Sequence, residues 1–217
     1  AWSITGNGTI SGVTNGRSVN ITSGGGNNTQ ITLSLAMTDA SIEIVPYTSN
    51  WPELFVKERE VLVQALGSWL VGLPEHIGST AVPGLAAKPV IDILATVTDL
   101  DAARRRLVAP LEAAGYTFRA DNPDTDRLFF VRGLPPAGSG RTHHLHLMEA
   151  AHGALRHIAF RDYLRDHPQA ARRYAALKAD LARRFRTDRR AYTEGKGAFI
   201  EAILEQAIEA TPANGPR

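Results

Sequence analysis

The stretch that decides the fold runs from residue 75 to residue 97 and reads Glu75-His-Ile-Gly-Ser-Thr-Ala-Val-Pro-Gly-Leu-Ala-Ala-Lys-Pro-Val-Ile-Asp-Ile-Leu-Ala-Thr-Val97. Its first part places Gly78, Ser79 and Thr80 in a turn, where free backbone N–H groups and two hydroxyls can meet an anion. Its last part, residues 90–97, is an almost continuous apolar run, typical of a central strand covered on both faces. Asp92 is the one carboxylate of this run. Burying it is costly unless a metal ion, a cation or a hydrogen-bond network pairs with it.

The composition indicates one ordinary domain plus an additional piece. The chain has 217 residues, of which 43% are hydrophobic, which is enough for a sizeable core. It has no cysteine, so it forms no disulfide and no thiolate site, and we expect a cytoplasmic protein. No apolar run reaches the roughly 18 residues of a transmembrane helix, so we expect no membrane partner.

Positive charge is concentrated in residues 154–190, which hold eleven Lys or Arg against four Asp. This excess can serve phosphate groups, or it can be the solvated surface of helices, and both interpretations stay open. The segment lacks interleaved aromatic residues and a nucleic-acid motif, and the net charge of the whole chain is only +2. We therefore do not expect nucleic acid to be a partner.

Residues 1–36 differ in composition from the rest of the chain. They are rich in Gly, Asn, Ser and Thr and hold one charged residue, Arg17. Short alternating pieces at 18–22 and 30–33 are consistent with weak strands. We interpret 1–36 as a leader, an appended segment or a fusion remnant outside the core, and Met37 as the native start of a domain at 37–217. The alternative is a small β module with a binding role of its own.

Periodicity and helix signals after Met37 predict helices and strands in mixed order. We predict strands at 42–45, 90–97, 116–118, 128–131 and 143–148. We predict helices from Asn50, which we expect to be the cap, to about Trp69, and at 99–114, 154–166, 168–186 and 188–209. The short links among the strands from 116 to 148 favour antiparallel pairs. The sequence thus predicts an α+β fold, with a mixed β-sheet flanked by helices and followed by C-terminal helices.

The strand at 143–148 carries two histidines on one face. The two-residue period of a strand puts His144, His146 and Met148 on one side and Leu145 and Leu147 on the other. The Cα atoms of the two histidines are then about 7 Å apart, which suits shared contact with one ligand or ion. A single histidine would more often be structural.

Common catalytic motifs are absent from the sequence. Residues 138–142 read Gly-Ser-Gly-Arg-Thr, but they lack the Gly-Lys-Ser/Thr ending of a P-loop and precede a strand instead of a helix. The sequence has no His-Glu-x-x-His, Gly-x-Ser-x-Gly or paired-Cys pattern. The constellation that remains is the Gly78-Ser79 turn, Asp92, and His144 with His146.

A Gly-Ser turn followed by a carboxylate on a central strand resembles the nucleotidyltransferase superfamily. The resemblance sharpens to the GrpB family over about residues 41–204. It is carried by the stretch 75–92 and by five further blocks, namely Val45-Pro-Tyr47 with Trp51-Pro52, His143-His-Leu-His146, Phe160-Arg-Asp-Tyr-Leu164, Tyr174-Ala-Ala-Leu-Lys178 and Tyr192-Thr-Glu-Gly-Lys196. It implies a nucleotidyltransferase-like fold. In that superfamily the Gly-Ser turn holds the nucleotide's phosphates, and carboxylates on two strands hold Mg²⁺ for phosphoryl-group transfer.

The resemblance assigns expected roles to individual residues. We expect Asp92, His144 and His146 to be catalytic residues and ligands of a divalent metal ion (Mg²⁺, Mn²⁺ or Zn²⁺). We expect phosphate or nucleotide contacts from Gly78, Ser79, Thr80, Lys88, Arg161, Lys178 and Lys196. We expect His76 and Tyr192 to line the cleft. The alternatives are a plain tight turn at Gly78, a structural role for Asp92, surface positions for the cations, and core packing for His76 and Tyr192.

The sequence departs from the superfamily at the metal site. Where the superfamily has an Asp-x-Asp pair, this chain has Val90-Ile91-Asp92, and the later strand offers histidines instead of an acid. A mixed Asp/His site favours Zn²⁺, Mn²⁺ or Ni²⁺ over Mg²⁺. The alternative is a hydrogen-bond network between Asp92 and the histidines that orders the cleft.

Two functions remain on the sequence alone. The first is an enzyme that transfers a nucleotidyl group from a nucleoside triphosphate to a small acceptor. The second is an accessory domain that binds a nucleotide or another anion without turnover. Relatives fused to dephospho-coenzyme-A kinase suggest this second role and a partner enzyme, and a homodimer is the other assembly to consider.

Overall fold

The computed structural model describes residues 2–5, 8–11, 20–23, 32–35, 41–135, 138–150 and 152–209. The residues described before residue 41 form four strands that pair among themselves. β1 (Trp2–Thr5) pairs with β4 (Thr32–Leu35), and β2 (Gly8–Ser11) pairs with β3 (Asn20–Ser23), both antiparallel. The predicted strands at 18–22 and 30–33 overlap β3 and β4. The assignment of residues 1–36 to a separate piece stays a prediction.

A mixed five-stranded sheet forms the centre of the body after residue 41. Its strands are β5 (Glu75–Ile77), β6 (Ile91–Val97), β9 (His143–Glu149), β8 (Arg127–Arg132) and β7 (Tyr116–Phe118), in that spatial order. The β6–β9 pair is parallel, and the other pairs are antiparallel. The predicted α+β class, the mixed sheet and the antiparallel pairing of the later strands are therefore confirmed.

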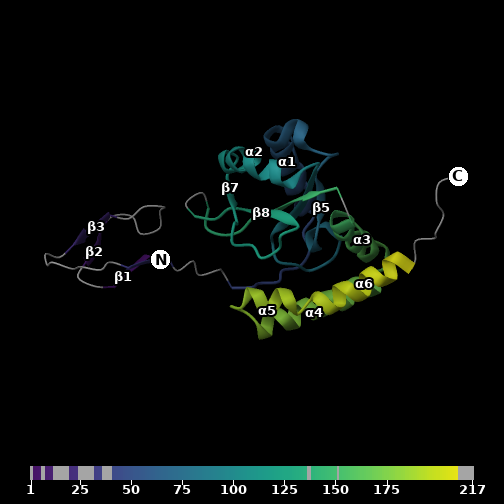
Figure 1. The fold of residues 1–217 in the computed structure, drawn as a ribbon. Coiled ribbons are helices and arrows are strands. Elements are labelled where there is room, and N and C mark those ends of the chain that lie inside the picture. Colours follow the sequence, from purple (N-terminus) through teal and green to yellow (C-terminus); the bar gives the residue numbers. More distant parts are fainter. Residues whose placement is uncertain are drawn as a thin grey trace.

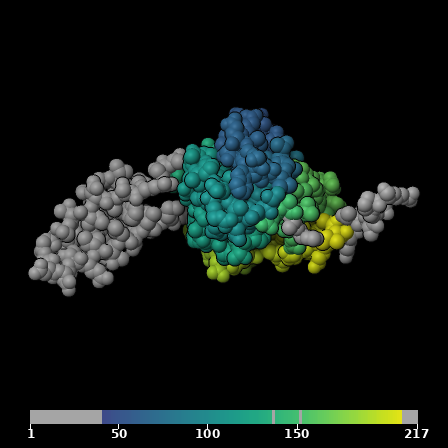
Figure 2. Space-filling view, turned by 45° about the horizontal axis from the view of Figure 1, so that its top comes forward, coloured from purple at the N-terminus to yellow at the C-terminus, as the bar shows by residue number. Residues whose placement is uncertain are grey.

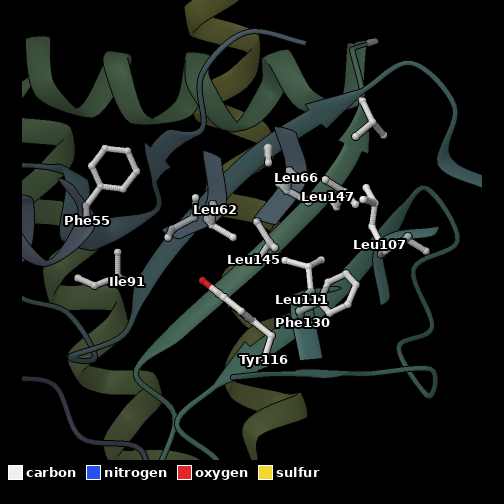
Figure 3. Packing of buried hydrophobic residues seen from close by; sticks show 14 of the residues in the cluster. Phe55, Leu62, Leu66, Ile91, Leu107, Leu111, Tyr116, Phe130, Leu145 and Leu147 are labelled. Atoms are coloured by element: carbon white, nitrogen blue, oxygen red, sulfur yellow. The ribbon is translucent and has the colours of Figure 1, made fainter. Parts of the chain in front are cut away.

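Two helices cover one face of this sheet. They are α1 (Asn50–Leu66) and α2 (Leu100–Ala113), which lie together above the strands in Figure 1. Residues 67–69 and 79–81 form two short 3-10 turns. The apolar stripe of α1, with Phe55, Leu62 and Leu66, packs on alternate residues of β6 and β9. Figure 3 shows these side chains meeting Leu107 and Leu111 of α2 in one continuous core.

The remaining helices cover the opposite face. They are α3 (His152–Asp166), α4 (Pro168–Arg184), α5 (Arg189–Glu194) and α6 (Gly197–Glu209), on the lower side of the sheet in Figure 1. Figure 2 looks onto the blue surface of the α1 region, with the yellow C-terminal helices at the lower edge. Their packing centres on Leu164, Tyr174 and Ile203, which meet Val82 and Leu85. None of the helices in the described ranges combines the length and apolar character that crossing a bilayer requires.

Three predicted details are wrong. Residues 42–45 form no strand, because Val45 makes only an isolated bridge to Ala87. Asn50 is the first residue of α1 and not its cap, and its N–H lies 3.4 Å from the Thr48 hydroxyl. The helix predicted at 188–209 is two helices, because α5 ends at Glu194 and α6 begins at Gly197, with a turn at residues 195 and 196. A side chain at Gly195 would come within 2.6 Å of Leu181.

Candidate functional site

The Gly78 turn packs directly against Asp92. Gly78 has a φ of 70°, in the left-handed region that favours glycine. A Cβ atom at this position would lie 2.5 Å from Oδ2 of Asp92, so glycine is required for the close approach as well as for the backbone conformation. The sequence therefore brings the predicted turn and the predicted carboxylate together, because β5 and β6 are adjacent strands in which Ile77 pairs with Asp92.

Asp92 lies beside both predicted histidines. Since β6 and β9 are parallel and in register, Asp92 is opposite His144, and Nδ1 of His144 lies 2.9 Å from Oδ1 of Asp92. Nε2 of His146 lies 3.9 Å from the same oxygen. Burial alone would raise the pKa of Asp92, but the hydrogen bond from His144 and the nearby His146 imidazole outweigh it and hold this pKa well below its usual range.

The proton positions in this group follow from these shifts. Burial lowers the pKa of His144, despite the opposing effect of Asp92, so the pair is a neutral imidazole and an ionised carboxylate. Nδ1 of His144 is then the donor and Asp92 the acceptor. Nε2 of His144 is buried and has no hydrogen-bond partner among the described residues. The hydrogen bond to Asp92 thus fixes the orientation of the His144 ring, and Nε2 keeps a free lone pair.

Arg127 and His157 join the site, although the sequence analysis did not identify them. Nη1 of Arg127 lies 3.4 Å from Nδ1 of His146 and 3.4 Å from Nε2 of His157. A guanidinium only donates, so Nδ1 of His146 accepts, and the N–H of this ring is at Nε2, on the Asp92 side. Burial lowers the pKa of His157 to about 4, so the His157 ring is neutral. Their relation to His146 depends on strand pairing and on the position of α3, and no spacing pattern in the sequence reveals it.

Three lysines approach the same cleft from separate segments. Lys88 precedes β6, Lys178 belongs to α4, and Lys196 lies between α5 and α6. Nζ of Lys88 and Nζ of Lys196 lie 5.0 and 4.7 Å from the centre of the Tyr192 ring. Lys178 is only 2% exposed, donates to the carbonyl of Ala86 at 2.6 Å and lies over the Tyr174 ring. Tyr174 also lines the cavity that Ser79 lines.

The three lysines have unusual acidities for that residue type. Burial, and then the charge of Lys196, lower the pKa of Lys88 to about 8 and that of Lys178 to about 7. Burial also lowers the pKa of Lys196. Asp92 acts in the opposite direction on all three lysines. The cleft therefore holds more positive charge than its one central carboxylate balances.

A cavity of about 550 Å³ connects these groups. Among the predicted residues, its walls include Gly78, Ser79, Thr80, Lys88, Asp92, His144, His146, Lys178, Tyr192 and Lys196. The structure thus gathers ten of the twelve predicted site residues around one space. The hydroxyl of Thr80 is already engaged, because it lies 2.9 Å from Nε2 of His76 and 3.4 Å from the carbonyl of Val90.

His76 and Arg161 are not among the residues that line this cavity. Strand alternation turns His76 to the opposite face of β5, where it stacks on Phe55 of α1 with ring centres 4.8 Å apart. Arg161 of α3 is held by Glu75 at 2.7 Å, by Asp162 at 2.8 Å and by the carbonyl of His76 at 2.9 Å. Both residues tie β5 to its neighbouring helices, and neither enters the ligand site proposed below.

The polar groups do not fit the divalent metal that the resemblance implies. Nδ1 of His144 carries the proton that it donates to Asp92, so Nε2, which is buried, is the one nitrogen of this ring that keeps a lone pair. Val90 is apolar and 8% exposed, and it supplies no second oxygen ligand. Across the described side chains, His, Cys, Asp and Glu form no group of three or more that could hold a metal ion. Asp92 and His144 form a hydrogen bond and His146 lies beside them, and the role of these three residues as metal ligands stays a prediction.

Comparison with known proteins defines the class of this fold. A solved complex named GLD-2/RNP-8 aligns with a TM-score of 0.52 and 14% identity, covering 80% of this chain and 70% of that chain. This distant similarity shows a nucleotidyltransferase-like fold and nothing about activity. A solved GrpB protein from Enterococcus faecalis aligns with a TM-score of 0.68 and 35% identity, covering 77% of this chain and 98% of that chain.

The family follows from the sequence comparison. The protein-family model described as GrpB protein matches residues 41–206 of this chain. A relative from Pseudomonas aeruginosa, the UPF0157 protein PA4798, is 51% identical over 173 residues, which are 80% of this chain and 70% of the relative. The chain belongs to the GrpB family, as its six sequence blocks predict.

Proposed function

We propose that this chain binds a nucleotide, or another small molecule that carries phosphate groups, in the cleft between the sheet and the C-terminal helices. The observation that carries this proposal is the position of Lys88, Lys178 and Lys196 around the Gly78-Ser79 turn and Asp92. Charge-assisted hydrogen bonds from lysine are among the strong contacts that proteins make with phosphate. Tyr174 and Tyr192 add aromatic surface beside these cations.

A thermal-shift screen of the full chain tests the proposal. ATP, other nucleoside triphosphates and coenzyme A would each be added with EDTA, Mg²⁺, Mn²⁺ or Zn²⁺, and adenosine would serve as the ligand without phosphate. A ligand at about 100 times its Kd stabilises the folded state by about 2.7 kcal/mol, which is roughly 5–10 °C for a domain of this size. We expect shifts with phosphate-bearing ligands and none with adenosine. Equal shifts with adenosine, or none with any ligand, would contradict the proposal.

A second function, nucleotidyl transfer to a small acceptor, is favoured by one specific observation. Asp92 orients His144 through Nδ1 and leaves Nε2 as a proton acceptor in a cavity-lining residue. In this reaction an acceptor hydroxyl attacks the α-phosphorus, the bond to pyrophosphate breaks, and the hydroxyl proton passes to Nε2 of His144. The same arrangement without turnover would be the accessory binding domain.

Pyrophosphate release separates the two functions. The full chain would be incubated with ATP and a bacterial metabolite extract as a source of acceptors. Transfer predicts pyrophosphate release that His144→Gln abolishes while ATP still produces its thermal shift. Binding of ATP with no release above that of His144→Gln would favour the accessory role.

A further inference from the structure

The charges along the cleft separate into a balanced part and an unbalanced part. Seven cations line the cavity, against four carboxylates. Asp124 and Asp126 both pair with Arg127, and Glu201 pairs with Arg156. Asp92 is the carboxylate that remains near the lysines, and two imidazoles already hold it. The three lysines therefore share one carboxylate that is engaged elsewhere.

The contacts of the lysines are weak replacements for a counter-ion. Lys178 has a backbone carbonyl and an aromatic face, and Lys88 and Lys196 have the Tyr192 face. None of the three ammonium groups forms an ion pair with a carboxylate within the ranges that the structure describes. A buried cation without a partner is costly, and the lowered pKa values of Lys88 and Lys178 reflect this cost. An anion would remove the cost by supplying the missing charge.

The same cleft is unsuited to a bridging cation. Phosphate chains carry several charges, which nucleotide-binding proteins often neutralise with Mg²⁺ held by carboxylate oxygens. Here the oxygen ligands reduce to Asp92, because Val90 is apolar, and Nδ1 of His144 already donates to one oxygen of that carboxylate. The positive charge that faces a ligand is supplied by fixed side chains.

We propose that Lys88, Lys178 and Lys196 bind a chain of two or more phosphate groups directly, without a bridging divalent cation. Three ammonium groups from three segments match a ligand with several anionic centres better than a single phosphate. Tyr192, 1% exposed, keeps Lys88 and Lys196 over its ring and so fixes their positions. The proposal rests on the phosphate-binding function above and specifies its ligand class as a polyphosphate.

Calorimetric titration of the full chain with inorganic tripolyphosphate tests this inference. The titration would be run in EDTA and in Mg²⁺ and repeated with orthophosphate. We expect binding in EDTA at least as tight as in Mg²⁺, because free Mg²⁺ competes for the ligand. We also expect at least tenfold tighter binding of tripolyphosphate than of orthophosphate. Lys196→Gln and Lys88→Gln should each weaken binding about tenfold.

A matched control and distinct outcomes make the test decisive. Lys57→Gln removes an exposed lysine of α1 and should leave the Kd unchanged. Binding that needs Mg²⁺ and is lost in Asp92→Asn would overturn the metal-free inference and leave the phosphate-binding function intact. Unchanged binding in both cleft-lysine variants would overturn the lysine assignment alone. No binding of tripolyphosphate in EDTA or in Mg²⁺ would overturn this inference, and the nucleotide screen would then decide whether the function survives.

Discussion

His143 and His144, which are neighbours in β9, belong to two polar clusters on opposite faces of the sheet. The two clusters differ in how well their positive and negative charges balance. On the α1 side, His143 lies near Glu58, which accepts hydrogen bonds from the Tyr116 hydroxyl at 2.8 Å and from Arg132. On the other side, His144 joins Asp92 among three lysines. Glu58 and Arg132 balance each other, whereas the lysines exceed the carboxylate beside them.

This difference separates a structural group from a binding site. The charges of Glu58 and Arg132 balance each other without a ligand, and removing one partner leaves the other uncompensated. A group with excess charge is costly in the free protein and gains when a ligand of opposite charge binds. Substitutions in the α1-side group should therefore change the stability of the fold and leave ligand affinity unchanged. Removing a cation from the cleft group should instead raise the stability of the free protein and weaken ligand binding.

The largest expected effect is on the α1 side. Glu58 is 4% exposed, and Glu58→Ala leaves Arg132 and the Tyr116 hydroxyl without their acceptor. We expect a loss of about 3–5 kcal/mol in the free energy of unfolding, measured by urea denaturation. Tripolyphosphate affinity of the folded variant should equal that of the wild type. A change in affinity with little change in stability would reverse the two assignments.

A smaller loss is expected at the contact between the turn and Asp92. Gly78→Ala places a Cβ atom 2.5 Å from Oδ2 of Asp92 in a left-handed backbone. Gly72→Ala is the matched control, because Gly72 has a φ of 79° and open space around it. The control should lose the roughly 1–2 kcal/mol of backbone strain, and Gly78→Ala should lose more and also weaken tripolyphosphate binding. Equal losses of stability with unchanged binding would show that the contact with Asp92 has no role.

A gain of stability is expected from Lys178→Met. The substitution removes a buried charge that has no carboxylate partner and keeps an unbranched apolar side chain, so we expect a gain in the free energy of unfolding at pH 7. The lost hydrogen bond to the carbonyl of Ala86 reduces this gain. The same variant should bind tripolyphosphate more weakly than the wild type. Urea denaturation and calorimetry measure the two effects, and a variant that is both destabilised and fully able to bind would contradict the proposed role.

The effect of pH gives a further test of the same lysine. Lys178 takes up a proton near pH 7 in the folded state and near pH 10.4 in the unfolded chain. Between these values the unfolded chain binds more protons, so wild-type stability should rise from pH 7 to pH 9. The advantage of Lys178→Met should narrow over this range. If the difference in stability between Lys178→Met and the wild type is the same at pH 7 and pH 9, Lys178 does not titrate in this range.

Sequence reasoning located the site where its signals were local. Three short-range patterns correspond to elements of the structure. The apolar run at 90–97 is β6, the Gly-Ser pair begins the turn at 78–81, and the histidines with a two-residue period lie in β9. Arg127 and His157 were missed because their place beside His146 depends on strand order and helix position. His76 was placed in the cleft, but the strand period that worked for His144 puts its side chain on the other face.

The metal expectation shows a different limit of the sequence. Residue types alone permit Asp92, His144 and His146 to be ligands, and the sequence analysis kept a hydrogen-bond network as the alternative. Only the register of β6 with β9 fixes Asp92 opposite His144, so that Nδ1 of His144 donates to Asp92 and Nε2 alone keeps a lone pair. Proton positions depend on burial and neighbours from several segments, which no local pattern contains.

The smallest effect is expected from removing residues 1–36. The strands described in this segment pair with one another, and none pairs with the five-stranded sheet that carries both polar groups. A chain that begins at Met37 should keep its melting temperature within about 1 °C and its tripolyphosphate Kd within about twofold. Differential scanning calorimetry and titration measure the two quantities. A clear drop in melting temperature would mean that the segment packs on the body of the protein, while a change in Kd alone would place it at the cleft.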